Sequence, residues 1–192
     1  MEGVKMVIKI LVADDTEKEL QTAKNIAKNK LVNVEADYVE TSLDAKQGIK
    51  TGKYHGVLSD VFFDGELRGI EIAKYSLKQR IPVVLITDTY HHGKSQPVCT
   101  WSRDESLVTL LDNEFSEDRK NKNWLTGFLA LLWAIKLSPK ITDEKIENGY
   151  IFEHAGCCFR EFSKGEKALI ECSTCNHDKN AFISMVKNHV KL

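Results

Sequence analysis

The chain has 192 residues, of which 27 are basic and 28 acidic, so its formal net charge is −1. With 42% hydrophobic and 29% charged residues, it has the composition of a soluble globular protein and is too apolar to be disordered. A prior of roughly 150 residues per domain predicts one or two domains, each long enough to bury a core. The balanced charge gives no reason to expect nucleic acid or an acidic membrane surface as the main partner.

Export and membrane insertion are not expected. The first fifteen residues, MEGVKMVIKILVADD, lack the apolar segment and small-residue cleavage site of a secretory signal. The longest apolar run, WLTGFLALLWAI at 124–135, is shorter than the roughly 20 residues that a membrane helix needs. The chain also has an odd number of cysteines, five. We therefore expect a cytoplasmic protein in a reducing compartment, with thiols available to metals rather than paired in disulfides.

Strand-like segments occur at four places in the first half of the chain. They are continuous apolar or alternating runs at 7–13, 34–40, 56–60 and 82–87. Segments with helical spacing separate them: one that follows Thr16, and others at about 42–50 and 69–79. Strands that alternate with helices indicate a parallel sheet with right-handed crossovers, so the predicted fold class is α/β, a doubly wound parallel sheet.

The first of these helices has a start signal. Thr16 and Glu19 have the spacing of a capping box, in which each side chain bonds the backbone N–H of the other residue. The apolar residues that follow share one helical face: Leu20, Ala23, Ile26 and Ala27. This face should pack on the sheet.

The pattern weakens after residue 87. We expect a loop over 88–96, a fifth strand over 97–101 and a helix over 104–112. A further helix over 123–137 is apolar almost all round. It should therefore be buried, either in the domain or against a partner such as a second copy in a homodimer.

Pro139 marks the expected boundary between a first domain, 1–138, and a small Cys-rich α+β module, 139–192. Within the module, 158–172 has the pattern of a β-hairpin that turns at Gly165. The stretch 180–190 has helical spacing, with Phe182, Met185, Val186 and His189 on one face.

Acidic residues stand where the predicted strands end. Asp14 and Asp15 follow the first strand, Asp60 ends the third and Thr87 ends the fourth. Because the carboxyl ends of parallel strands meet at one edge of the sheet, these side chains should come together. Three converging carboxylates favour a hard divalent cation such as Mg²⁺, beside which a carboxylate can act as a nucleophile on phosphorus. The simpler alternative is that these aspartates only cap helices.

The segments ILVADD, then VLSDVFFDG with GIEIA downstream, then IPVVLIT resemble the receiver domain of two-component response regulators. The resemblance covers about residues 7–112, and extends to 137 if the apolar helix belongs to it. It implies a five-stranded, flavodoxin-like parallel sheet flanked by helices. It also implies that Asp14 and Asp15 bind Mg²⁺, that Asp60 accepts a phosphoryl group from a histidine kinase, and that Thr87 binds this group and triggers a conformational switch.

Two features depart from the family pattern. Receivers have a lysine just after the fifth strand, whereas CTWSRDE offers only Arg103, and Lys94 lies earlier in the loop. Arg68 also stands where the family usually has an acid before the glycine. His91 and His92 follow Thr87 closely; they belong either to a solvated loop or to the crevice, where they would ligate metal or tune the phosphoryl lifetime.

The tail has a partial zinc pattern that loosely resembles a zinc ribbon or zinc finger. Cys172 and Cys175 form a CxxC, which can supply two of four tetrahedral ligands, and Cys158 lies across the predicted hairpin. His189 is the expected fourth ligand. The alternative ligands are Cys157, His154 and His177. Inert buried thiols and a redox pair are the competing interpretations.

The expected function is a phosphoacceptor switch with Mg²⁺, whose partners are a sensor histidine kinase or phosphotransfer protein and a downstream protein. It is not an enzyme beyond phosphorylation and dephosphorylation of its own Asp60. One alternative is a pseudo-receiver that binds partners without phosphotransfer. A Mg²⁺-dependent phosphohydrolase is less favoured, because the chain lacks a DxDx(T/V) pattern. A DNA-binding output is not expected, since the tail shows no clear helix-turn-helix.

Overall fold

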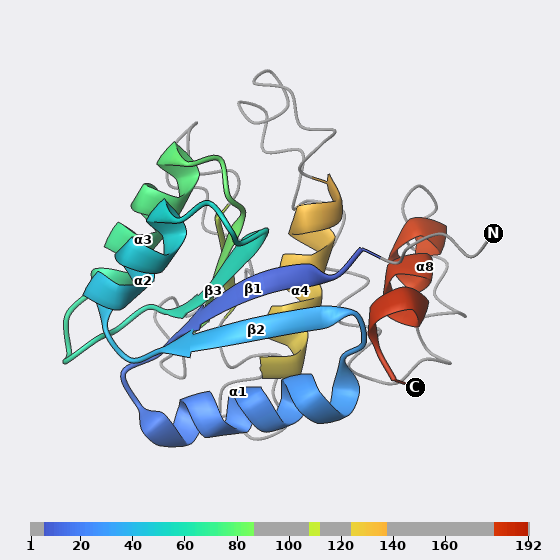
Figure 1. Cartoon of the computed structure of the whole chain (residues 1–192), viewed down its shortest axis with the longest axis horizontal. Helices are drawn as coiled ribbons and strands as arrows, with labels where there is room; N and C mark the ends of the chain where they lie inside the picture. Colours follow the sequence, from blue (N-terminus) through green and yellow to red (C-terminus); the bar gives the residue numbers. More distant parts are fainter. Residues whose placement is uncertain (1–5, 87–107, 112–123, 138–178, 192) are drawn as a thin grey trace, which may run out of the picture.

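The computed structural model describes residues 6–86, 108–111, 124–137 and 179–191. Strands and helices alternate over residues 6–86 (Figure 1). In order they are β1 (Ile8–Ala13), α1 (Glu17–Lys30), β2 (Val34–Val39), α2 (Ser42–Lys50), β3 (Gly56–Asp60), α3 (Arg68–Lys78), β4 (Val83–Ile86), β5 (Val108–Leu111), α4 (Trp124–Leu137) and α8 (Lys179–His189). The predicted α/β class with a parallel sheet is confirmed.

The strands lie in the order β2-β1-β3-β4-β5, and every neighbouring pair is parallel. This order is compatible with a flavodoxin-like doubly wound sheet, in which strands are added first on one side of β1 and then on the other. The register aligns Ala13 of β1 with Ser59 of β3. The residues that follow, Asp14 and Asp60, therefore lie side by side at the carboxyl edge of the sheet.

Helices cover both faces of the sheet. On one face α1, α4 and α8 pack in one hydrophobic cluster with alternate residues of β1, such as Ile10 and Val12. On the other face α2 and α3 pack in a second cluster with Leu11 and Ala13. Because successive residues of β1 point to opposite faces and both faces are covered, the strand is continuously apolar from Ile10 to Ala13 rather than alternating.

The apolar helix predicted at 123–137 forms as α4 and is buried within the chain itself. It packs against β3, β4 and α1. Gly56 permits this close approach, since a Cβ there would lie 2.8 Å from side-chain carbons of Leu131 and Ile135. Burial in the domain is thus confirmed, and a homodimer through this helix stays a prediction. None of the helices in the described ranges combines the length and apolar character needed to span a bilayer.

One element differs from the expectation. A helix was expected over 104–112, but Val108–Leu111 form β5, which pairs with β4 from Val83↔Val108 to Ile86↔Leu111. A short apolar run such as VTLL fits a strand as well as a helix turn, and the open edge of β4 decides between them. The strand expected over 97–101 lies outside the described residues.

The last predicted helix forms as α8, and it belongs to the core of the sheet. Phe182, Met185 and Val186 are buried in the same cluster as α1 and α4. The Lys136 ammonium on α4 donates to the Ala181 carbonyl on α8 over 2.9 Å. The segment 138–178 lies outside the described residues, so the domain boundary after Pro139 stays a prediction.

Candidate functional site

Three carboxylates converge at the carboxyl edge, as strand-end reasoning leads one to expect. One oxygen from each of Asp14, Asp15 and Asp60 lies within 4.8 Å of the other two. Asp14 and Asp60 are buried, and Asp15 is exposed at the rim. The site therefore combines two buried carboxyl groups with one that is open to solvent. We refer to these three residues as the acid cluster.

The acid pair after β1 is held by short backbone contacts. The backbone N–H of Thr16 donates to Asp14 Oδ1 over 2.9 Å, which ends the strand and leads into α1. Asp15 Oδ2 accepts from the backbone N–H of Asp64 over 2.6 Å. Asp15 Oδ1 accepts from the Thr16 hydroxyl at a longer 3.4 Å. Both oxygens of Asp15 are thus oriented by neighbouring donors.

Asp60 is fixed by the chain around it. Its Oδ1 accepts from the backbone N–H of Val61 over 2.7 Å, and the Ser59 hydroxyl donates to its carbonyl over 2.8 Å. Gly69, in the first turn of α3, lies directly against this carbonyl: a Cβ at Gly69 would be 1.9 Å from Asp60 O. Only glycine fits there, which allows α3 to begin next to the site.

A tight turn after β3 positions Asp15. Phe63 and Glu66 exchange two backbone hydrogen bonds of 2.9 Å. Between them, Asp64 and Gly65 both have positive φ, 52° and 76°. This is the pattern of a type I′ turn, which favours Asp-Gly. Sequence reasoning missed its role, although the Asp-Gly dipeptide signals such a turn. The turn aims the N–H of Asp64 at Asp15.

The predicted capping box does not form. Thr16 is the N-cap of α1, but its side chain makes no cap hydrogen bond. The Glu19 carboxylate instead accepts from the indole N–H of Trp124 over 2.9 Å. A buried indole needs an acceptor, and a carboxylate is a strong one, so a contact between distant segments outcompetes the local cap.

The acid cluster fits a hard divalent cation by its donor chemistry. Carboxylate oxygens are preferred ligands of Mg²⁺. One oxygen from each aspartate lies within 4.8 Å of the other two, so the three carboxylates could converge on a single ion. Like charges this close also repel one another, and a cation relieves the repulsion.

Several predicted residues of this site fall outside the described part of the chain. They are Thr87, His91, His92, Lys94 and Arg103. Their roles stay predictions. Arg68 is described: its guanidinium pairs with Glu66 over 2.9 Å, next to the turn that holds Asp15.

The predicted zinc ligands are described only in part. The residues outside the described ranges are Cys157, Cys158, Cys172, Cys175, His154 and His177. His189 lies at the end of α8, with its Nδ1 3.4 Å from the carbonyl oxygen of Val32. A zinc ion bound by His189 would therefore lie beside the turn between α1 and β2, away from the acid cluster. The zinc site stays a prediction.

No protein-family model, curated protein or solved structure matches this chain. Assignment of a function to the acid cluster therefore depends on its residues and their geometry.

Proposed function

We propose that the chain is a receiver-like phosphoacceptor, in which Asp60 accepts a phosphoryl group and the acid cluster holds Mg²⁺. The observation that carries the proposal is the convergence of Asp14, Asp15 and Asp60 within 4.8 Å at the carboxyl edge of the sheet. Ligand sites of open α/β sheets lie at this edge, where the strand order reverses. In this sheet that point lies between β1 and β3, the strands that supply the three acids.

The chemistry is a transfer of a phosphoryl group between two nucleophiles. An Asp60 carboxylate oxygen attacks phosphorus, a new P–O bond forms, and the bond from phosphorus to the donor breaks. The donor leaves with the electron pair of that bond: an imidazole from a phosphohistidine, or acetate from acetyl phosphate. Bound Mg²⁺ would supply positive charge that offsets the negative charge of the transferred group.

The surrounding chain contributes positioning. Val61 N–H holds one Asp60 oxygen, and Gly69 lets α3 approach the Asp60 carbonyl. Thr87, at the end of the fourth predicted strand, is proposed to bind the phosphoryl group. The proposed donor is a sensor histidine kinase or phosphotransfer protein, and the proposed readers are α4, the tail and a downstream protein.

The direct test is intact mass after incubation with Mg²⁺ and acetyl phosphate. The parent should gain the mass of one phosphoryl group, and Asp60→Asn should gain none. Asp64→Asn is the matched control, because it changes an aspartate in the same loop and asparagine tolerates the positive φ found there. A parent that stays unmodified while folded, or an adduct that persists in Asp60→Asn, would contradict the proposal.

A pseudo-receiver is the second candidate, and the observation that favours it is the absence of a lysine in CTWSRDE. Arginine keeps the charge but not the compact geometry of an ammonium. A folded parent that binds Mg²⁺ yet forms no adduct would support this candidate. Catalytic release of inorganic phosphate from added phosphate esters would instead support the less favoured phosphohydrolase.

A further inference from the structure

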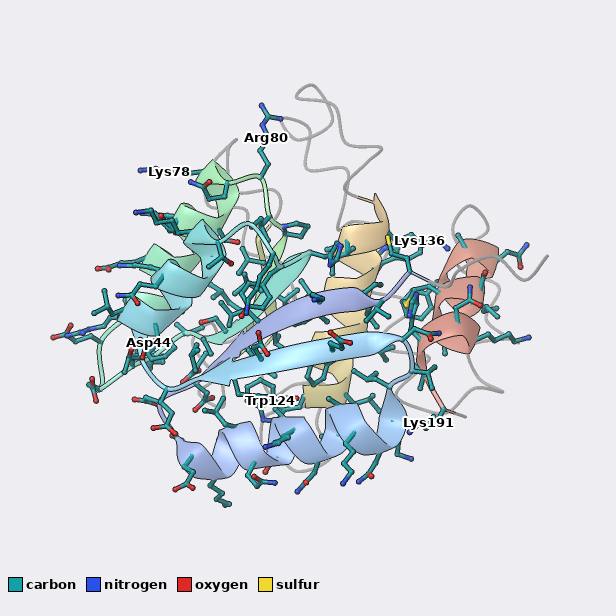
Figure 2. The ribbon with its side chains drawn as sticks, in the orientation of Figure 1. Asp44, Lys78, Arg80, Trp124, Lys136 and Lys191 are labelled. Atoms are coloured by element: carbon teal, nitrogen blue, oxygen red, sulfur yellow. The ribbon has the colours of Figure 1, made fainter. Side chains whose placement is uncertain are left out.

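Two hydrogen bonds at the start of α1 link the acid cluster to the start of α4. Nearest the cluster, the Thr16 hydroxyl donates to Asp15 Oδ1 over 3.4 Å. One helical turn later, Glu19 Oε2 accepts from Trp124 Nε1 over 2.9 Å. Trp124 is the first residue of α4, is fully buried and lies beside α1 (Figure 2). The first turn of α1 therefore contacts the acid cluster at one end and α4 at the other.

The same two side chains are the partners of a capping box. In a capping box, the Thr16 hydroxyl would accept from Glu19 N and the Glu19 carboxylate would accept from Thr16 N. In the structure Thr16 N is bonded to Asp14 instead, and Glu19 N donates to the Thr16 carbonyl over 2.9 Å. All four groups that the box would use are thus bonded elsewhere. The N–H and hydroxyl of Thr16 donate to the acid cluster, the N–H of Glu19 donates to the Thr16 carbonyl, and the Glu19 carboxylate accepts from Trp124.

We propose that the first turn of α1 switches between two sets of hydrogen bonds and thereby couples the acid cluster to α4. In one state, which the structure shows, Thr16 binds the acids and Glu19 binds Trp124. With a divalent cation bound, the carboxylate oxygens of Asp14 and Asp15 would share electron density with it and become weaker acceptors for the N–H and hydroxyl of Thr16. The reciprocal Thr16–Glu19 box then forms, and the Glu19 carboxylate leaves the indole of Trp124. This coupling rests on the cation site of the proposed function.

Coupling of this kind is reciprocal. If cation binding weakens the Glu19–Trp124 hydrogen bond, then removing that bond must strengthen cation binding by the same factor. The Trp124 N–H is the group to remove, because its loss changes no charge near the acids. Replacing Glu19 would also delete a negative charge close to the cation and confuse the two effects.

The chain supplies a matched control on the same helix. Trp133 is also buried in α4, but its indole N–H has no hydrogen-bond partner among the residues that the structure describes. Trp124→Phe and Trp133→Phe therefore remove the same group from the same helix, once with a bond to Glu19 and once without. We expect Trp124→Phe to bind Mg²⁺ about fivefold tighter than the parent by calorimetry, and Trp133→Phe to bind it as the parent does.

The unmodified protein provides a second readout that depends on no substitution. On titration with Mg²⁺, the indole N–H proton resonance of Trp124 should move upfield as its hydrogen bond to Glu19 is lost. The corresponding resonance of Trp133 should stay in place. Absence of the Trp124 resonance from the spectrum of Trp124→Phe assigns it, even if that variant is less stable.

The outcomes separate the coupling from the proposed function. If the parent binds Mg²⁺ but Trp124→Phe binds it no tighter, or the two variants change affinity equally, the coupling is wrong and the cation site stands. An unmoved Trp124 resonance at saturating Mg²⁺ also contradicts the coupling. A parent that binds no divalent cation overturns the site itself and the coupling with it. Cation binding without phosphorylation of Asp60 leaves the coupling intact and rejects only the phosphoacceptor.

Discussion

The carboxyl ends of the strands form one edge of the sheet and the amino ends form the other. The contacts that hold these two edges span different distances along the sequence. At the carboxyl edge, Asp14 and Asp60 accept hydrogen bonds from Thr16 and Val61, one or two positions along the chain, and Asp15 accepts from Asp64, 49 residues away. At the amino edge, the turn after α1 is closed by α8: the backbone N–H of Val32 donates to the His189 carbonyl over 3.0 Å. The His189 ring also approaches Val32, 157 residues away in the sequence.

This difference separates the candidate site from the closure of the fold. The acid cluster takes its shape from strand ends and the turns that follow them, so it depends on β1, β3 and the start of α3. The amino edge depends on α8 and the two residues after it: Val190 forms a β-bridge with Leu31, and the backbone N–H of Lys191 donates to the Lys30 carbonyl over 2.7 Å. Substitutions at one edge should therefore leave the other largely intact. The first two of the four predictions below test this separation, the third tests the acid cluster alone, and the fourth tests a contact outside both edges.

Phe182→Ala should have the largest effect, and it acts at the amino edge. The ring is fully buried on α8 and meets Trp133 edge-on, with 5.5 Å between ring centroids. Its loss leaves a cavity between α8 and α4, and we expect a cost of about 3–5 kcal/mol in the free energy of unfolding. Urea denaturation measures this cost. Hydrogen exchange should rise in α8 while the carboxyl edge keeps its protection, and equal loss at both edges would contradict the separation.

Gly69→Ala should come next, and it acts at the carboxyl edge. The added methyl group would meet the Asp60 carbonyl and the Val61 backbone, neither of which can move freely. We expect a loss of about 3 kcal/mol, at the upper end of overpacking costs, together with weaker cation binding. Gly52→Ala is the control for crowding: Gly52 has open space around it, so its cost is only about 1–2 kcal/mol of backbone strain, which comes from its positive φ of 68°.

Addition of Mg²⁺ should stabilise the protein through the acid cluster. At a Mg²⁺ concentration ten times the dissociation constant, the free energy of unfolding should rise by about 1.4 kcal/mol, and a chelator should remove this gain. Asp15→Asn should abolish most of it, because one ligand charge is lost. Thermal denaturation with and without Mg²⁺ measures the effect. The same gain in Asp15→Asn as in the parent would place the cation elsewhere.

The smallest effect is expected from lowering the pH. It acts through a contact that lies away from both edges. Hydrogen bonds from Lys53 (2.8 Å) and Tyr54 (2.6 Å) hold the pKa of Asp37 below its ordinary value. A carboxyl with a lowered folded pKa stabilises the protein above its unfolded pKa of 3.8, and this contribution is lost as the pH falls through the folded value. Because Asp37 is largely exposed, the loss is under about 1 kcal/mol. Asp37→Asn should flatten the pH dependence of urea stability below pH 4 relative to the parent.

The first four strands, the described helices and the approach of the three aspartates could be predicted from local sequence patterns. The run 7–13 and the aspartates after it indicate a buried parallel strand that ends at the carboxyl edge of the sheet, where the candidate site lies. The segment 108–111 could not be assigned in this way, because four apolar residues suit a strand or a helix turn. The open edge of β4, which lies far away in the sequence, made it a strand.

The sequence by itself determined that aspartates follow the first and third strands and that strand-like and helix-like segments alternate in the first half of the chain. It could do so because hydrophobic period and composition are local properties. Only the tertiary structure decided what Thr16 and Glu19 bind and where α8 packs. A local helix cap contributes about 1 kcal/mol to stability. A buried indole that needs an acceptor can therefore take the Glu19 carboxylate away from such a cap. The apolar face of α8 is equally visible in the sequence, but its partners on α1 and α4 are set by the shape of the surface that the sheet leaves uncovered.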